Sequence, residues 1–269
     1  MTLWEKLPLW GVVLLAAASL GCNKLKARDQ LNKGVMSFRN SQFQDAVEHF
    51  KKSVQLDPTY LNARLYLATA YFQQYIPGGQ SAANLQVAQD AIQTYQQVLN
   101  MDPNNETALG SIAELYYNMK NFDKAKAYQR KLMQLEPNNP QPYYWIGVID
   151  WAIAYQNDGE MRKTLKLNIP KPDGSLPPLP PKASAQLADQ NGALVNEGID
   201  ALQKAIALKP DDFNTMVYIN LLYRQKADID TEKATHKQDL ATADNWEQKA
   251  MNLRKSPSAT PATSGSSSQ

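Results

Sequence analysis

The chain has 269 residues, with 28 Lys and Arg against 26 Asp and Glu, so its formal net charge at pH 7 is only +2. A charge this close to zero, carried by dispersed basic residues, excludes strong attraction to nucleic acid, and we expect no nucleic-acid partner. A single Cys excludes both a disulfide scaffold and a zinc site built on four thiolates.

An apolar, uncharged run fills residues 7–21 and ends in small residues immediately before Cys22. The run is shorter than the roughly 20 residues that a helix needs to cross a bilayer. Small residues at the end of such a run are typical of a secretory signal peptide. The end of the run, Ser19-Leu20-Gly21-Cys22, resembles the lipobox of bacterial lipoproteins, in which the Cys is lipidated and becomes the new N-terminus.

This resemblance implies a signal peptide over residues 1–21, a lipid on Cys22 and a short tether over residues 22–26. The protein would then be exported and anchored to a membrane through its lipid, on the periplasmic side or at the cell surface. Two other outcomes stay open on the residues alone, namely ordinary cleavage near residues 16–18 and an uncleaved anchor.

Beyond this leader, a phrase consisting of a bulky apolar residue, a charged residue and Pro occurs four times. The four copies are Leu56-Asp57-Pro58, Met101-Asp102-Pro103, Leu135-Glu136-Pro137 and Leu208-Lys209-Pro210. Because Pro lacks an amide hydrogen and disfavours helical geometry in the residue before it, each copy predicts the end of a helix. The Pro residues are 45, 34 and 73 residues apart, which a 34-residue unit with two insertions accounts for.

Small residues recur at two places in each unit, and we expect them where paired helices cross. The first place holds Gly34, Ala68, Ala113 and Gly147, and the second holds Ala46, Ala91, Ala125 and Gly198. Small residues let two helices approach closely while larger apolar residues fill the space around the crossing. A 34-residue helical hairpin of this kind resembles the tetratricopeptide repeat (TPR) family. The resemblance implies an all-α solenoid of stacked hairpins.

We expect this solenoid over residues 27–255, with four clear repeats and a degenerate fifth that begins at Phe213. In the fifth repeat Asn220 replaces the small residue of the first helix. The tail over residues 256–269 has no charged side chain and no large aliphatic or aromatic residue, so it is expected to be disordered.

Two insertions interrupt the repeats, near residues 76–86 and 157–190. The second contains six Pro between residues 168 and 182, a composition typical of polyproline II. The segment over residues 168–182 is either a docking strand for an aromatic groove or a stiff spacer that the repeat tolerates. Because the packing residues of the flanking helices are intact without it, we expect folding not to need it.

Aromatic residues recur one step beyond the main packing position of the first helix in each repeat. They are Phe38, Phe72, Tyr117 and Trp151, and Tyr144 lies on the same side of its helix as Trp151. In the TPR family this position faces the concave groove, so the resemblance implies that these rings bind a peptide or a partner protein. The alternative is that they pack between repeats or against the insertions, as core residues do.

No enzyme motif occurs in the chain. There is no phosphate-binding Gly-x-x-x-x-Gly-Lys-Ser/Thr, no His-Glu-x-x-His, and neither His has another His or Cys nearby in the sequence. We therefore expect no catalytic residue, cofactor, metal or small-molecule substrate. The resemblance implies a non-enzymatic interaction scaffold of the bacterial cell envelope. The alternative is a regulatory or adaptor subunit of an enzyme system whose catalytic chain is separate.

Overall fold

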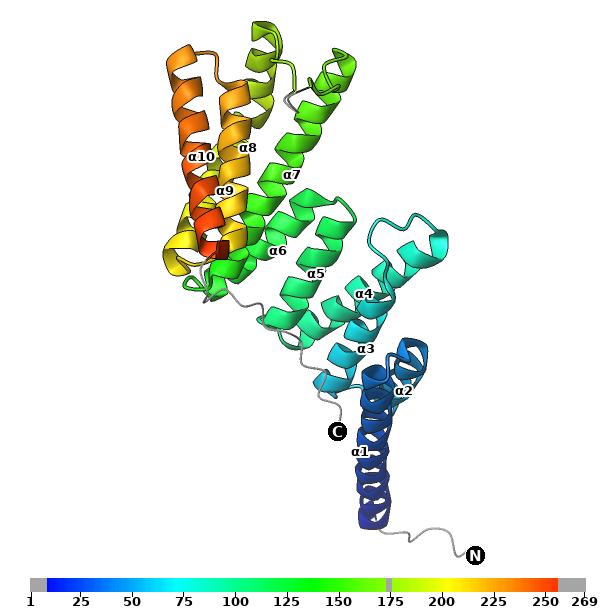
Figure 1. Cartoon of the computed structure of the whole chain (residues 1–269). Helices are drawn as coiled ribbons and strands as arrows, with labels where there is room; N and C mark the ends of the chain where they lie inside the picture. The colour runs from blue at the N-terminus through cyan, green and yellow to red at the C-terminus, as the bar shows by residue number, and fades with distance from the viewer. Residues whose placement is uncertain (1–8, 173–175, 256–269) are drawn as a thin grey trace, which may run out of the picture. The chain divides into compact units, whose positions relative to one another are not determined.

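The computed structural model of the chain describes residues 9–172 and 176–255, with side chains from Cys22 onward. Every regular element in these residues is a helix, which confirms the all-α class (Figure 1). The ten helices are α1 (Leu9–Arg39), α2 (Phe43–Leu56), α3 (Leu61–Gln74), α4 (Ala82–Met101), α5 (Glu106–Asn118), α6 (Phe122–Leu135), α7 (Pro140–Thr164), α8 (Pro181–Leu208), α9 (Phe213–Ile229) and α10 (Lys233–Lys255).

The chain divides into two compact units, residues 1–121 with α1 to α5 and residues 122–269 with α6 to α10. Within each unit, every helix packs against the next one along the chain. The repeated phrases end helices as predicted, because α2, α4, α6 and α8 each end two residues before the Pro of the phrase. Successive hairpins of this kind bury their apolar faces only against their neighbours.

Glycines stand at helix crossings where the sequence predicted small residues. A Cβ added to Gly147 of α7 would overlap the side chain of Leu202 in α8, and one added to Gly34 of α1 would overlap the ring of Phe50 in α2. Nonpolar carbon atoms attract each other best at about 3.5–4.0 Å, so these helices approach closely only because the glycines carry no side chain.

Gly147→Ala should therefore destabilise the second unit by roughly 1–3 kcal/mol, as overpacked core positions do. Gly159→Ala in the same helix is the matched control, because nothing lies within 4 Å of a Cβ added there. Ala is favoured over Gly in a helix interior by roughly 0.5–1 kcal/mol, so the control should stabilise. Urea unfolding followed by circular dichroism measures both. Equal stability of Gly147→Ala and wild type would contradict the close crossing.

The first insertion forms a loop that leads into α4 and is held by hydrogen bonds. Gly78 has a φ of +78°, a conformation that Gly adopts without strain. Asn84, buried in the first turn of α4, holds this loop in place: its Oδ1 accepts from the amide of Ile76 at 2.8 Å, and its Nδ2 donates to the carbonyls of Ile76 and Gly79 at 2.8 and 2.9 Å.

Much of the second insertion is helical, because α7 continues to Thr164 and α8 already begins at Pro181. The Pro-rich segment lies between them, and its residues 173–175 are outside the described part of the chain. The segment from Leu176 onward is not a detached spacer. Leu179 packs against the main apolar core of the second unit, the cluster that includes Leu187 and Leu202.

A buried arginine also holds this segment. Arg162 of α7 is only 3% exposed, and its Nη1 donates to the carbonyl of Pro177 at 2.7 Å. Its Nε donates to Asp158 at 2.7 Å and its Nη2 to Asp228 of α9 at 3.1 Å. The Pro-rich segment is therefore hydrogen-bonded to the side chain that joins α7 to α9. This contact argues against the expectation that folding does not need the segment, which stays an untested prediction.

The residues expected to form a tether, 22–26, lie inside α1, which runs unbroken from Leu9 to Arg39. No Pro stands between residues 9 and 39 to stop the helix, so the first helix of the repeats extends back through Cys22. Ser53 of α2 fixes this part of α1 by donating to the carbonyl of Ala27 at 2.7 Å. Residues 1–8 and the predicted disordered tail lie outside the described residues.

The degenerate fifth repeat is the hairpin of α9 and α10. Asn220, which stands where the other repeats have Gly or Ala, is buried, and its Nδ2 donates to the carbonyl of Ala243 in α10 at 2.7 Å. The crossing tolerates this amide because its donor is satisfied.

Candidate functional site

Aromatic rings gather on the side of α7 that faces α9. Tyr144 and Trp151, both predicted groove residues, meet the ring of Tyr218 in α9 edge-on, with centroids 5.7 and 5.3 Å apart. Trp151 also stacks on Tyr155, with centroids 5.1 Å apart and an interplanar angle of 24°. We call these four residues, Tyr144, Trp151, Tyr155 and Tyr218, the aromatic surface.

The aromatic surface consists of three half-buried rings and one exposed ring. Tyr144, Trp151 and Tyr218 are half-buried and pack against the core cluster of the second unit, and burial raises the pKa of Tyr218. Tyr155 is 58% exposed. Tyr155 is already held against the Trp151 ring. A partner that covers Tyr155 therefore costs this side chain little conformational entropy.

Helical spacing explains how α7 presents three of these rings. Trp151 follows Tyr144 by seven residues and precedes Tyr155 by four, and residues at these spacings share one face of a helix. Sequence reasoning missed Tyr155, although its spacing from Trp151 signals the same face. It also missed Tyr218, which comes from another helix and carries no local signal.

The other predicted groove residues lie in the first unit. Phe38 of α1 is half-buried, meets Phe43 of α2 edge-on at 5.3 Å and packs against the core cluster around Phe50. Phe72 of α3 and Tyr117 of α5 are also half-buried. Each of these three rings therefore leaves only part of its surface accessible to a partner.

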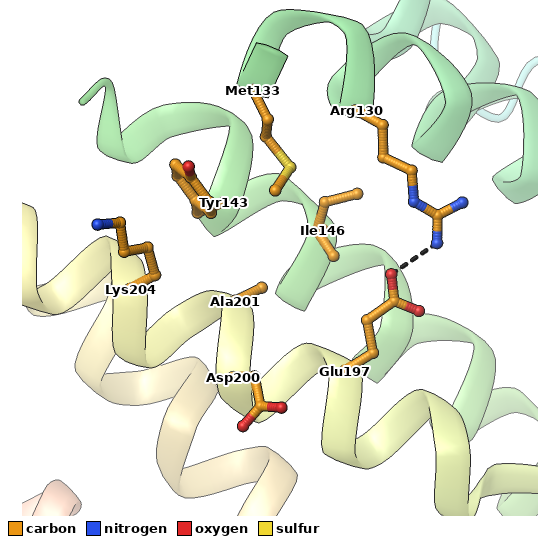
Figure 2. A pocket seen from close by; sticks show the side chains of 8 residues that line it. All are labelled: Arg130, Met133, Tyr143, Ile146, Glu197, Asp200, Ala201 and Lys204. Carbon is orange, nitrogen blue, oxygen red and sulfur yellow. Dashed lines mark hydrogen bonds and ion pairs between the residues drawn. The ribbon is translucent and has the colours of Figure 1, made fainter. Parts of the chain in front are cut away.

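A hollow of about 500 Å³ lies between α6, α7 and α8 in the second unit (Figure 2). Met133, Ile146 and Ala201 supply its apolar surface, one from each helix. The other lining residues are Arg130, Tyr143, Glu197, Asp200 and Lys204. The α7 residues of the hollow, Tyr143 and Ile146, lie on a different side of the helix from Trp151.

A chain of alternating charges closes one end of this hollow. Lys126 of α6 donates to Asp150 of α7 at 2.5 Å and to Glu197 of α8 at 2.9 Å, and Arg130 donates to the second oxygen of Glu197 at 2.6 Å. Asp150 is fully buried, and its Oδ2 has no hydrogen-bond partner in the described part of the chain. We call Lys126, Arg130, Asp150 and Glu197 the ion network.

Burial and pairing act in opposite directions on these carboxyl groups. Burial raises the pKa of Asp150 to about 6, although the hydrogen bond from Lys126 favours its charged form. For Glu197, burial opposes ionisation, but the bonds from Lys126 and Arg130 are stronger together and lower its pKa.

The raised pKa of Asp150 predicts a pH dependence of stability. Between the unfolded value of 3.8 and the folded value of about 6, the folded state binds more protons, so this group lowers the free energy of unfolding as the pH rises. The expected loss is up to about 3 kcal/mol. Urea unfolding at several pH values, with Asp150→Asn as the variant that cannot titrate, measures it. The free energy of unfolding of wild type, minus that of Asp150→Asn, should decrease as the pH rises from 3.8 to about 6. A difference that does not change with pH would contradict the prediction.

Cys22, the predicted lipidation site, lies exposed on α1. In the described residues, no helix is long and apolar enough to span a bilayer. No three His, Cys, Asp or Glu side chains of this part of the chain are arranged to hold a metal ion.

Comparisons with known proteins agree with this architecture. Residues 88–147 match the family model of the tetratricopeptide repeat. The sequence search of curated proteins gave no match.

Among solved structures, MamA residues 41-end from Desulfovibrio magneticus RS-1 aligns with a TM-score of 0.56 and 18% identity, covering 86% of this chain and 97% of that one. A MamA crystal structure aligns with a TM-score of 0.55 and 15% identity, covering 85% of this chain and 92% of that one. At these identities the likeness establishes the fold, and the predicted TPR-type solenoid is confirmed.

Proposed function

We propose that this protein is a non-enzymatic interaction scaffold that binds a partner protein or peptide segment on the aromatic surface. The observation that carries this proposal is the exposed Tyr155 ring stacked on Trp151, with Tyr144 and Tyr218 beneath. A hot-spot residue of an interface is one whose truncation to Ala costs about 2 kcal/mol or more of binding free energy. Such residues are enriched in Trp and Tyr. The TPR-type fold, a stack of hairpins with extended faces, also supports an interaction role.

The proposal extends to the first unit through Phe38, Phe72 and Tyr117. These rings occupy the same repeat position as Trp151, and each keeps part of its surface accessible. Within the first unit, a partner segment that contacts more than one of these three rings gains affinity from each one.

Co-purification of the tagged full chain from its native cells, followed by mass spectrometry, tests the kind of partner. A cell-envelope assembly protein as the main partner would support the scaffold. A soluble enzyme would favour the adaptor subunit instead, and the cell-envelope role would be lost.

We also propose that the protein is exported and held at a membrane by a lipid on Cys22. The apolar run that ends at Cys22 supports this, and so do the exposed Lys24 and Lys26 beside it. A basic residue near an anionic membrane surface contributes about 1 kcal/mol of attraction.

Labelling of growing cells with radioactive palmitate tests the anchor. Wild type should incorporate label and sediment with membranes, whereas Cys22→Ala should lose both properties. Wild-type protein without label would contradict lipidation, whatever the outcome for the aromatic surface.

A further inference from the structure

We propose that the hollow between α6, α7 and α8 is a second docking site, for an acidic peptide segment that inserts one large apolar side chain between carboxylates. This site is distinct from the aromatic surface, because the two use different sides of α7. It is defined by the residues that Figure 2 shows around the hollow.

The apolar part of the hollow determines what can fill it. Met133 and Ile146 project into the space, and Ala201 leaves room opposite them (Figure 2). A volume of about 500 Å³ lies within the roughly 300–1,000 Å³ of ligand pockets in proteins. A large aliphatic or aromatic side chain of a partner would cover this surface and remove it from water.

The charged rim favours an acidic partner, because the carboxylate of Glu197 is already paired whereas Arg130 and Lys204 keep free donors. Both carboxylate oxygens of Glu197 already accept bonds, one from Lys126 and one from Arg130. Arg130, by contrast, is more than half exposed and uses one of its amino groups on Glu197, which leaves further donors for a partner.

Lys204 supplies a second cation at the other end of the hollow (Figure 2). It is exposed, and within the described residues it forms no hydrogen bond or ion pair. Asp200, the remaining carboxylate, points away from Met133 and Ile146 in the same view. Arg130 and Lys204 therefore offer cationic donors at the two ends of the hollow, while the carboxylate of Asp200 lies at its edge and is turned from the apolar floor.

The ion network holds this rim in place before a partner arrives. Glu197 fixes the guanidinium of Arg130 and is itself fixed by Lys126, which is 7% exposed and anchored on the buried Asp150. Two cations separated by an apolar floor match a peptide that has a carboxylate on each side of an apolar residue. A small anion alone would leave the floor uncovered, so the geometry favours the peptide.

A random peptide library displayed on phage tests the proposal with the full-length protein. The library is first depleted on Lys204→Glu and then selected on wild type. The matched control is Lys182→Glu, which makes the same charge change on the same helix about 33 Å away at 1.5 Å per residue. That distance exceeds the Debye length of about 10 Å at 0.1 M salt, so the control leaves the local field at the hollow almost unchanged.

The selected peptides should carry Asp or Glu within a few residues of Leu, Ile, Met or Phe. A synthetic copy of the best peptide should bind Lys204→Glu at least tenfold more weakly than wild type, with binding to Lys182→Glu and Tyr155→Ala unchanged. Melting curves of all three variants should match the wild type, because the three residues are exposed.

Three results would overturn the site: selected peptides without carboxylates, an equal loss with Lys182→Glu, or the absence of any enriched peptide. A loss with Tyr155→Ala but not with Lys204→Glu would also overturn it and would assign the peptide to the aromatic surface. The scaffold proposal does not depend on these outcomes, because its test uses the Tyr155 variant and a native partner.

Discussion

Arg162→Ala should lower the free energy of unfolding of the second unit by about 3–5 kcal/mol, the usual cost of breaking a buried charged network. The substitution leaves Asp158, which is buried, without its cation, and it frees the carbonyl of Pro177. It also removes the bond from α7 to Asp228, whose pKa burial already raises. The midpoint of urea unfolding measures the effect.

Arg224→Ala is the matched control in the same unit. Arg224 pairs with Asp244 and Glu247, whose side chains are 67% and 50% exposed. Exposed pairs contribute about 0–1 kcal/mol, so this variant should unfold almost as wild type does. If Arg162→Ala has the same free energy of unfolding as Arg224→Ala, Arg162 does not hold the Pro-rich segment in a way that matters for stability. The expectation that folding does not need this segment would then stand.

Lys126→Met should cost a similar amount, about 3–5 kcal/mol at neutral pH, because it leaves the fully buried Asp150 without a cation. Lys126 also joins α6 to α8 through Glu197, and this link is lost with it. Thermal and urea unfolding of the full chain measure the change.

The double variant Lys126→Met with Asp150→Asn separates the buried charge from simple packing loss. No charge then remains buried at this position, so the double variant should recover a large part of the lost stability. If it is as unstable as Lys126→Met alone, the lysine acts through its apolar stem rather than through the pair.

Local rules predicted most of the architecture. The four phrases that contain Pro end helices for reasons that concern only neighbouring residues. Gly147 was expected at a crossing because the 34-residue spacing brings small residues together, and Leu202 does occupy the space in front of it. The helical periodicity that placed Trp151 on one face of α7 also needs no knowledge of the rest of the chain.

Features that depend on distant residues could not be predicted in the same way. Lys126 meets Asp150 across 24 positions and Glu197 across 71, and no pattern in the sequence marks these three as partners. The contact of Arg162 with Pro177 joins a helix to an insertion whose composition alone is typical of a solvated spacer. The tether expected at residues 22–26 was inferred from the leader, whereas its continuity with α1 depends on packing against α2.

The affinity of the identified partner for Tyr155→Ala tests the scaffold most directly. Phe213→Ala is the control, because Phe213 is another accessible ring of the same unit, 36% exposed at the start of α9. We predict that isothermal titration will show about thirtyfold weaker binding for Tyr155→Ala, equivalent to about 2 kcal/mol, and an unchanged Kd for Phe213→Ala. The melting temperature of both variants should stay at the wild-type value. A wild-type Kd for Tyr155→Ala would contradict binding on the aromatic surface.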